Sequence, residues 1–351
     1  MRAPTAALGL TVAAALLLSG CSGSAAAGSG TGPADELRLG YFDTLTHAPA
    51  LVGIEQRFFA DNLGATVLHA QAFGAGPAAI EALSAGAIDA AYVGPSPAVN
   101  TFVQSAGRSA VIVAGASISG AALVVRDGID SPADLQDTTI ATPQLGNTQD
   151  VALRSWLADE GYATDLTGGG DVTVAPTDSA RALTLFQSGQ IDGAWLPEPW
   201  VSRLVLEADA HVLVDEADLW PNGEFPTTVL LVGAAFNRDH PETVRALVQG
   251  HLAAVAWLNE HPGEAAAVIN KKLVADTGTA LSDAVIDRAL SHLRFTVDPL
   301  AATFPVTLRN AVLVGTAKDG DLAGLFDLTQ LNGVLAAASG APVSAAGLGT
   351  E

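Results

Sequence analysis

Three short stretches of the sequence combine hydroxyl or amide donors with the start of an expected helix. They are Leu45-Thr46-His47-Ala48, Gly94-Pro95-Ser96-Pro97-Ala98 and Leu145-Gly146-Asn147-Thr148-Gln149-Asp150. A helix N-terminus leaves backbone N–H groups unpaired, so it can hold an anion without a positively charged side chain. Each stretch can equally be an ordinary helix cap. If the three meet at one edge of the fold, they predict a site for a small anion.

The six residues from Trp195 to Trp200 offer a different kind of contact, because two indole rings flank Glu198. Aromatic rings can cover the apolar body of a ligand, although they also pack in ordinary cores. A carboxylate that faces a bound anion lowers the affinity. If Glu198 points at the ligand, the ligand is predicted to carry a positive or donor group as well, as a taurine-like zwitterion does.

The sequence does not contain the common patterns of catalytic and metal sites. We find no nucleophile elbow, no Cys/His pair and no phosphate-binding loop, and the seven His are scattered without ligand spacing. A net charge of −21 makes binding to nucleic acid unfavourable. We therefore expect a protein that binds a small molecule, with no catalytic residue, metal, cofactor or nucleic-acid partner.

The first residues have the layout of a bacterial lipoprotein signal. Arg2 precedes an apolar run over residues 6–18, and Leu18-Ser19-Gly20-Cys21 resembles a lipobox whose Cys becomes lipidated. Cys21 is the only cysteine, so no disulfide can form within the chain. We predict a signal peptide over residues 1–20, lipidation at Cys21 and a flexible tether over 21–34, which would hold the protein at the membrane outside the cytoplasm. A plain secretory signal with an incidental Cys is the alternative.

The elements that must position these residues alternate between short apolar strands and helices, which predicts an α/β fold. Residues 73–100 resemble residues 176–203 at a spacing of about 100 residues, which predicts two similar lobes. Residues 109–125 are read as two strands that meet at a bend where the chain crosses between the lobes. Ligands bind beyond the carboxyl ends of strands in open α/β sheets. The loops to consider therefore follow Tyr41, Gln71, Val93, Ala141, Ala175 and Trp195.

Several segments in a fixed order carry a family resemblance. They are His47-Ala48-Pro49-Ala50-Leu51, Gln56-Arg57-Phe58-Phe59, the paired Gly86-x-Ile88-Asp89 and Gly189-x-Ile191-Asp192, Glu198-Pro199-Trp200, and residues 321–334. From residue 37 to about residue 338, the chain resembles the sulfonate, taurine and nitrate-type solute-binding proteins of ATP-driven (ABC) importers. That family also includes binders of pyrimidine precursors of thiamine.

The resemblance implies a periplasmic-binding-protein-like fold of type II, in which two Rossmann-like lobes are joined by two crossover strands. These would lie near residues 117–123 and 225–229, with residues 35–118 and 229–340 in lobe 1 and residues 119–228 in lobe 2. The implied protein is a monomer that closes on its ligand and delivers it to the permease subunits of an importer. The candidate ligand-binding residues are Leu45, Thr46, His47, Gly74, Gly76, Ser96, Gly120, Gly146, Asn147, Thr148, Gln149, Glu198, Trp200 and Thr227.

The expected ligand is a small organic anion, such as an aliphatic sulfonate or a taurine-like compound. Nitrate, bicarbonate and a pyrimidine precursor of thiamine are the alternative ligands. A pyrimidine-processing enzyme, a metal-binding lipoprotein and a surface sensor domain are the alternative classes of protein.

Overall fold

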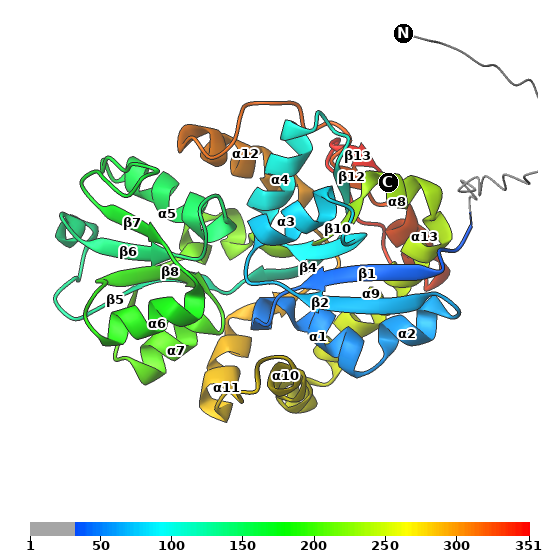
Figure 1. The fold of residues 1–351 in the computed structure, drawn as a ribbon, viewed down its shortest axis with the longest axis horizontal. Helices are drawn as coiled ribbons and strands as arrows, with labels where there is room; N and C mark the ends of the chain where they lie inside the picture. The colour runs from blue at the N-terminus through cyan, green and yellow to red at the C-terminus, as the bar shows by residue number, and fades with distance from the viewer. Residues whose placement is uncertain (1–31) are drawn as a thin grey trace, which may run out of the picture. The chain divides into compact units, whose positions relative to one another are not determined.

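Two separate mixed β-sheets, each covered by helices, make up the computed structural model, which describes residues 32–351 (Figure 1). The predictions for Cys21, the signal peptide and the tether up to residue 31 lie outside the described residues. The predicted α/β fold class is confirmed. We call each sheet with its packed helices a lobe.

The first sheet has eight strands in the order β13-β12-β4-β10-β3-β1-β2, with β11 also paired to β4. Its strands are β1 (Glu36–Tyr41), β2 (Val67–Ala72), β3 (Ala90–Val93), β4 (Ala110–Ser119), β10 (Pro226–Gly233), β11 (Leu293–Phe295), β12 (Phe326–Asp327) and β13 (Gly349–Thr350). β1 runs parallel to β2 and β3, whereas β10 runs antiparallel to β3 and β4.

The second sheet has five strands in the order β7-β6-β8-β5-β9. They are β5 (Ala121–Val125), β6 (Thr139–Thr142), β7 (Thr173–Pro176), β8 (Gly193–Pro197) and β9 (His211–Asp215). β6 is parallel to β7 and β8, and β5 is antiparallel to β8. The path β5-β8-β6-β7 thus has the same pattern of directions as β10-β3-β1-β2 in the first sheet.

Helices cover both faces of each sheet. They are α1 (Ala48–Glu55), α2 (Phe58–Leu63), α3 (Gly76–Ser84), α4 (Pro95–Gln104), α5 (Thr148–Asp159), α6 (Ser179–Gln187), α7 (Trp200–Glu207), α8 (Ala234–Asp239), α9 (Pro241–Glu260), α10 (Pro262–Thr277), α11 (Asp283–Ser291), α12 (Phe304–Leu313) and α13 (Thr329–Ala337). In Figure 1, α3 and α4 lie on one side of the first sheet and α1 and α2 on the other. Among residues 32–351, no helix is long and apolar enough to cross a membrane.

The repeat predicted from the sequence has equivalent local structure in the two lobes. Both copies turn at a glycine with positive φ, 69° at Gly86 and 73° at Gly189. Three residues later, the carboxylates of Asp89 and Asp192 each accept a bond from a neighbouring backbone N–H, that of Arg38 (2.8 Å) and that of Thr139 (2.9 Å). These matching contacts support one architecture used twice.

The chain crosses between the sheets at Gly120, which lies between β4 and β5, so the bend predicted in this region is present. Gly120 has φ 73°, and an added Cβ would come 2.3 Å from the Leu293 side chain, so no other residue fits there without strain. The return crossing reaches β10, where the Thr227 hydroxyl donates to the carbonyl oxygen of Ser119. The two crossings therefore lie side by side, whereas the lobe boundaries at 118/119 and 228/229 stay a prediction.

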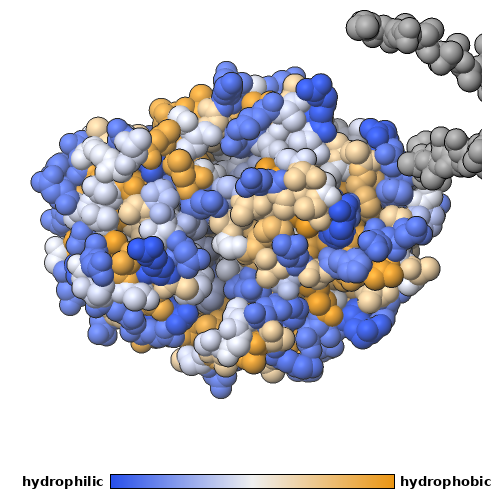
Figure 2. Space-filling view, in the orientation of Figure 1, coloured by the Kyte–Doolittle hydropathy of each residue, from blue (hydrophilic) through white to orange (hydrophobic). Residues whose placement is uncertain are grey.

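Apolar side chains are buried against each sheet, whereas polar and charged side chains cover most of the face seen in Figure 2. The largest core surrounds the first sheet and includes Leu39, Tyr92 and Leu230. The second sheet has one core on each face, one around Leu183 and Leu196 and the other around Trp156 and Trp195. Each sheet thus gives the loops at its strand ends a rigid base.

Candidate ligand-binding site

Loops from both sheets enclose a small polar cavity of about 30 Å³, which we call the inner chamber. That volume has room for about two water molecules. Its lining residues are Phe42, Thr44, Thr46, His47, Gly74, Gly94, Pro143, Asn147, Gln149, Ser179, Pro197 and Thr227.

The sequence points to six loops at the carboxyl ends of strands, and each of them contributes to the inner chamber. In the first lobe, they supply Phe42 after β1, Gly74 after β2 and Gly94 after β3. In the second lobe, they supply Pro143 after β6 and Ser179 after β7, and Pro197 is the last residue of β8. The carboxyl ends of parallel strands meet at one edge of a sheet, and here two such edges face each other.

The inner chamber offers hydrogen-bond donors without a formal charge. Its polar side chains are the hydroxyls of Thr44, Thr46, Ser179 and Thr227, the amides of Asn147 and Gln149, and the imidazole of His47. The Thr227 hydroxyl already donates to the Ser119 carbonyl oxygen, and the hydroxyls of Thr44 and Thr46 share one hydrogen bond of 3.0 Å. No Asp, Glu, Lys or Arg is among the lining residues. A bound anion would therefore be held by dipoles and hydroxyl or N–H donors, which do not neutralise its charge.

The imidazole of His47 is held neutral with a defined tautomer. Its Nδ1 accepts a bond from the Phe42 N–H at 3.1 Å, so the proton must be on Nε2. Burial lowers the pKa of His47 to about 3. His47, which lines the inner chamber, is therefore neutral with its proton on Nε2 throughout the physiological pH range.

The first turns of α4 and α5 contact each other beside the inner chamber. The Ser96 N–H donates to Thr148 Oγ1 at 3.4 Å, and an added Cβ at Gly94 would come 2.2 Å from that same oxygen. An added Cβ at Gly76 would come 3.2 Å from Asn147 Oδ1. The absence of side chains at Gly76 and Gly94 therefore lets the two lobes approach closely.

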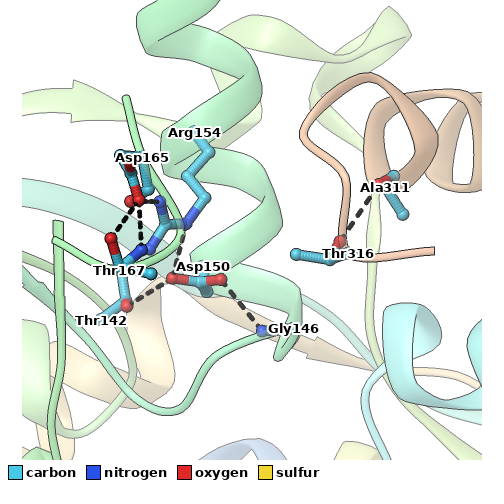
Figure 3. A network of polar contacts seen from close by, with 8 residues as sticks. All are labelled: Thr142, Gly146, Asp150, Arg154, Asp165, Thr167, Ala311 and Thr316. Carbon is cyan, nitrogen blue, oxygen red and sulfur yellow. Dashed lines mark hydrogen bonds and ion pairs between the residues drawn. The ribbon is translucent and has the colours of Figure 1, made fainter. Parts of the chain in front are cut away.

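A buried ion pair supports the loop before α5 (Figure 3). Asp150 Oδ1 accepts bonds from Thr142 Oγ1 (2.8 Å) and Arg154 Nε (3.1 Å), and Oδ2 accepts one from the Gly146 N–H (2.9 Å). Arg154 also donates to the carbonyl oxygen of Asp165. Asp150 and Arg154 are both almost fully buried, so they fix the position from which Asn147 and Gln149 reach the chamber.

Six of the fourteen candidate residues line the inner chamber, and the others lie elsewhere. The six are Thr46, His47, Gly74, Asn147, Gln149 and Thr227. Gly76, Ser96 and Thr148 lie at its edge, and Gly146 lines a separate groove. Leu45 is fully buried in the first lobe, and Trp200 lines a larger neighbouring cavity.

Glu198 lies beside the crossing at Gly120, away from the inner chamber. Its Oε1 accepts a bond from Arg288 Nη1 at 3.2 Å, and its Oε2 accepts one from the Ser202 N–H at 3.0 Å. Burial raises the pKa of Glu198. Because this carboxylate already has partners, its presence gives no reason to expect an amine on the ligand.

Six lining residues are not among the fourteen candidates, although Gly94 and Pro197 lie in segments singled out from the sequence. They are Phe42, Thr44, Gly94, Pro143, Ser179 and Pro197. Four of them carry no polar side-chain group, so a search for donors overlooks them. Ser179 opens α6 directly after Asp178, which caps that helix by accepting from the N–H groups of Ala180 and Arg181. The pair Asp178-Ser179, just after a strand, is the sequence feature that could have identified Ser179 as a site residue.

Curated relatives include binding proteins for several small anions. A Bacillus subtilis protein, named provisionally as an aliphatic sulfonates-binding protein, is 27% identical over 73% of this chain and 74% of its own. The bicarbonate-binding protein CmpA of Synechococcus elongatus is 25% identical over 74% of this chain and 64% of its own. Four Brucella proteins named only as binding proteins are 24% identical over 62% of this chain, which spans 65% of their length.

Solved structures give the same fold. The alkanesulfonate-binding protein SsuA from Xanthomonas axonopodis pv. citri, bound to MOPS, has a TM-score of 0.67 and 24% identity, covering 80% of this chain and 92% of that one. The periplasmic nitrate-binding protein NrtA from Synechocystis PCC 6803 has a TM-score of 0.69 and 15% identity, covering 82% and 83%. The predicted periplasmic-binding-protein-like fold is thereby confirmed.

The model of the NMT1-like family matches residues 30–273, which is more than half of the chain. The resemblance stated from the sequence motifs is thus confirmed. This chain belongs to the NMT1-like family.

Proposed function

We propose that this chain is the solute-binding component of an ATP-driven importer and that it captures a small organic anion, such as an aliphatic sulfonate. One observation carries the proposal. The inner chamber brings neutral donors from both lobes to one point, with no charged side chain among its lining residues. Such a site favours an anion that keeps its charge while it is held by N–H and hydroxyl groups. The names of two relatives support a sulfonate, and that of a third, a bicarbonate-binding protein, supports an anion more generally.

Under this proposal, the protein delivers its ligand to the importer and catalyses no reaction. A ligand held between two lobes is released when they separate, and the permease subunits of the importer would recognise the closed form. We propose that the protein acts as a monomer, with no cofactor and no catalytic residue. Hydrolysis or synthesis of a pyrimidine by the purified protein would contradict this assignment.

Calorimetric titration and thermal shift against aliphatic sulfonates, nitrate, bicarbonate and pyrimidines test the ligand class. A ligand at about a thousandfold excess over its Kd adds about 4 kcal/mol to stability, which is easily detected. We expect Gln149→Leu to weaken sulfonate binding about tenfold because one donor is lost. Gln104→Leu, the same change on an exposed helix face, is the control. A shift with nitrate or bicarbonate alone would replace the organic anion by an inorganic one, and no shift with any anion would contradict the proposal.

We further propose that the protein is held outside the cytoplasmic membrane by lipid on Cys21. The order of Arg2, the apolar run and the lipobox-like tetrad supports this anchor. Metabolic labelling with a radioactive fatty acid should mark the wild-type protein, and Cys21→Ser should abolish the label and release the protein from the membrane fraction. Equal labelling of both forms would exclude Cys21 as the anchor.

A further inference from the structure

Helix α11 belongs to the first lobe but also packs against α7 of the second lobe (Figure 1). Two of its buried side chains, those of Ile286 and Ala289, lie in the core that surrounds the first sheet. The strand that follows it, β11, pairs with β4 of the same sheet. Because α11 is tied to the first sheet in these two ways, its contact with α7 is a contact between the lobes.

Arg288 reaches from α11 to two polar groups of the second lobe. Its Nη1 donates to Glu198 Oε1 at 3.2 Å and to Ser202 Oγ at 3.0 Å. Glu198 is 1% exposed and Ser202 is fully buried, whereas the side chain of Arg288 is 21% exposed. We call these three residues the interlobe clasp.

The second lobe holds Glu198 in place but does not neutralise its charge. Its Oε2 accepts a bond from the Ser202 N–H in the first turn of α7, and its own N–H donates to the carbonyl oxygen of Gly120 at 2.8 Å. Asp215 of the same lobe lies nearby and adds further negative charge. Among the described residues, the ion-pair partner of Glu198 is Arg288, which belongs to the other lobe. A buried carboxylate without a cation is strongly unfavourable, so the second lobe depends on the first for this contact.

The interlobe clasp lies at one end of the cavity of about 550 Å³ that Trp200 lines. One wall of this cavity includes Pro199, directly after Glu198, and the opposite wall includes Leu281, two residues before α11 begins. A movement that separates the two walls would therefore pull Arg288 away from Glu198. None of the three residues of the clasp lines this cavity or the inner chamber, so none is placed to touch a ligand there.

We propose that the interlobe clasp stabilises the closed arrangement of the two lobes and thereby raises the affinity for the ligand. Arg288 and Glu198 are then positioning residues, which act on the ligand only through closure. When a ligand binds only the closed form, its apparent Kd equals the intrinsic Kd divided by the closed fraction of the protein. The inference rests on the proposed function in one respect, which is that the ligand is held between the lobes.

Calorimetric titration with butane-1-sulfonate measures the contribution of the clasp to binding. We expect Arg288→Met to raise the Kd about tenfold at unchanged stoichiometry, because its closed form buries a carboxylate that has lost its cation. Arg238→Met is the matched control, since it breaks an exposed ion pair with Asp239 within the first lobe, and its Kd should stay within about twofold of wild type. A purely local folding defect would instead lower the stoichiometry and leave the Kd unchanged.

Two further variants separate the effect of charge from that of packing. Arg288→Met/Glu198→Gln should bind the sulfonate more tightly than Arg288→Met alone, because the uncompensated charge is gone and the amide oxygen can still accept from the Ser202 N–H. Arg288→Lys keeps the positive charge and should keep part of the affinity. A double variant that binds more weakly than Arg288→Met would show that the ion pair does not act as one unit.

Small-angle X-ray scattering of the ligand-free proteins tests closure without any ligand. Arg288→Met should have a larger radius of gyration than wild type, because a larger fraction of its molecules is open. Where butane-1-sulfonate binds the wild type, an unchanged or lower Kd for Arg288→Met overturns the inference while the anion site stands. Where the sulfonate does not bind, the proposed ligand class fails, and an equal radius of gyration for the two proteins then overturns the inference as well.

Discussion

At the residue scale, Asp150 determines the position of the loop before α5, although it does not line the inner chamber. Removing its side chain leaves Arg154, which is 1% exposed, without its ion-pair partner. We expect Asp150→Ala to lower the free energy of unfolding by about 3–5 kcal/mol. Urea-induced unfolding followed by circular dichroism measures this loss.

The double variant Asp150→Ala/Arg154→Leu should recover part of the loss, because the uncompensated charge is then gone. Glu224→Ala breaks an exposed pair with Arg294 and serves as the control, with an expected change of about 0–1 kcal/mol. A double variant no more stable than Asp150→Ala would show that the hydrogen bonds to Thr142 and Gly146 matter more than the charge.

Glu198 shows which site residues the sequence could not place. Its partner Arg288 is 90 positions away in the sequence, on α11. No local pattern reveals such a pairing, so the sequence could only suggest that the carboxylate faces a ligand. Thr46, His47, Asn147 and Gln149 could be chosen because each lies at or near a helix start just after a strand, and that arrangement is local.

At the element scale, the repeat made the two-sheet architecture predictable. The helix, glycine turn and strand recur in both copies because each strand must be buried and each helix must stop before it. Elements whose form depends on distant partners were less predictable. The pattern of residues 322–338 alone predicts one continuous helix, but the helix begins only at Thr329. Phe326 and Asp327 instead pair with β13, and Phe326 also pairs with β4.

At the scale of the whole molecule, buried histidines and buried carboxyl groups have opposite effects on how stability depends on pH. Burial lowers the pKa of His47 to about 3 and of His251 to about 4, so these two favour unfolding as the pH falls below about 6.5. Burial raises the pKa of Glu216 to about 7, and Asp43 has a similar value. Below about pH 7, these two acids are protonated in the folded state, and their effect opposes that of the histidines.

Glu216→Gln should expose this balance, because the amide mimics the protonated acid and does not titrate. A raised folded pKa gives stability at low pH that is lost as the pH rises toward about 7. We expect similar free energies of unfolding for wild type and variant at about pH 5. At about pH 8, the variant should be more stable by about 2–3 kcal/mol.

Urea-induced unfolding across this pH range checks the expectation, with the exposed Glu260→Gln as the control. The Trp195 indole donates to Glu216 at 2.8 Å, and the amide oxygen of Gln can accept the same bond. A constant difference between wild type and Glu216→Gln from pH 5 to pH 8 would contradict the prediction.

Because the chain crosses between the sheets at Gly120 and returns near Thr227, the second sheet is inserted within the sequence of the first. This insertion determines the order in which the strands of the two sheets are synthesised. All five strands of the second sheet lie between Ala121 and Asp215. The first sheet draws its strands from Glu36 through Thr350, so it still lacks β10 to β13 when synthesis has passed β9. A growing chain thus contains every strand of the inserted sheet before it contains the last four strands of the sheet that receives the insertion.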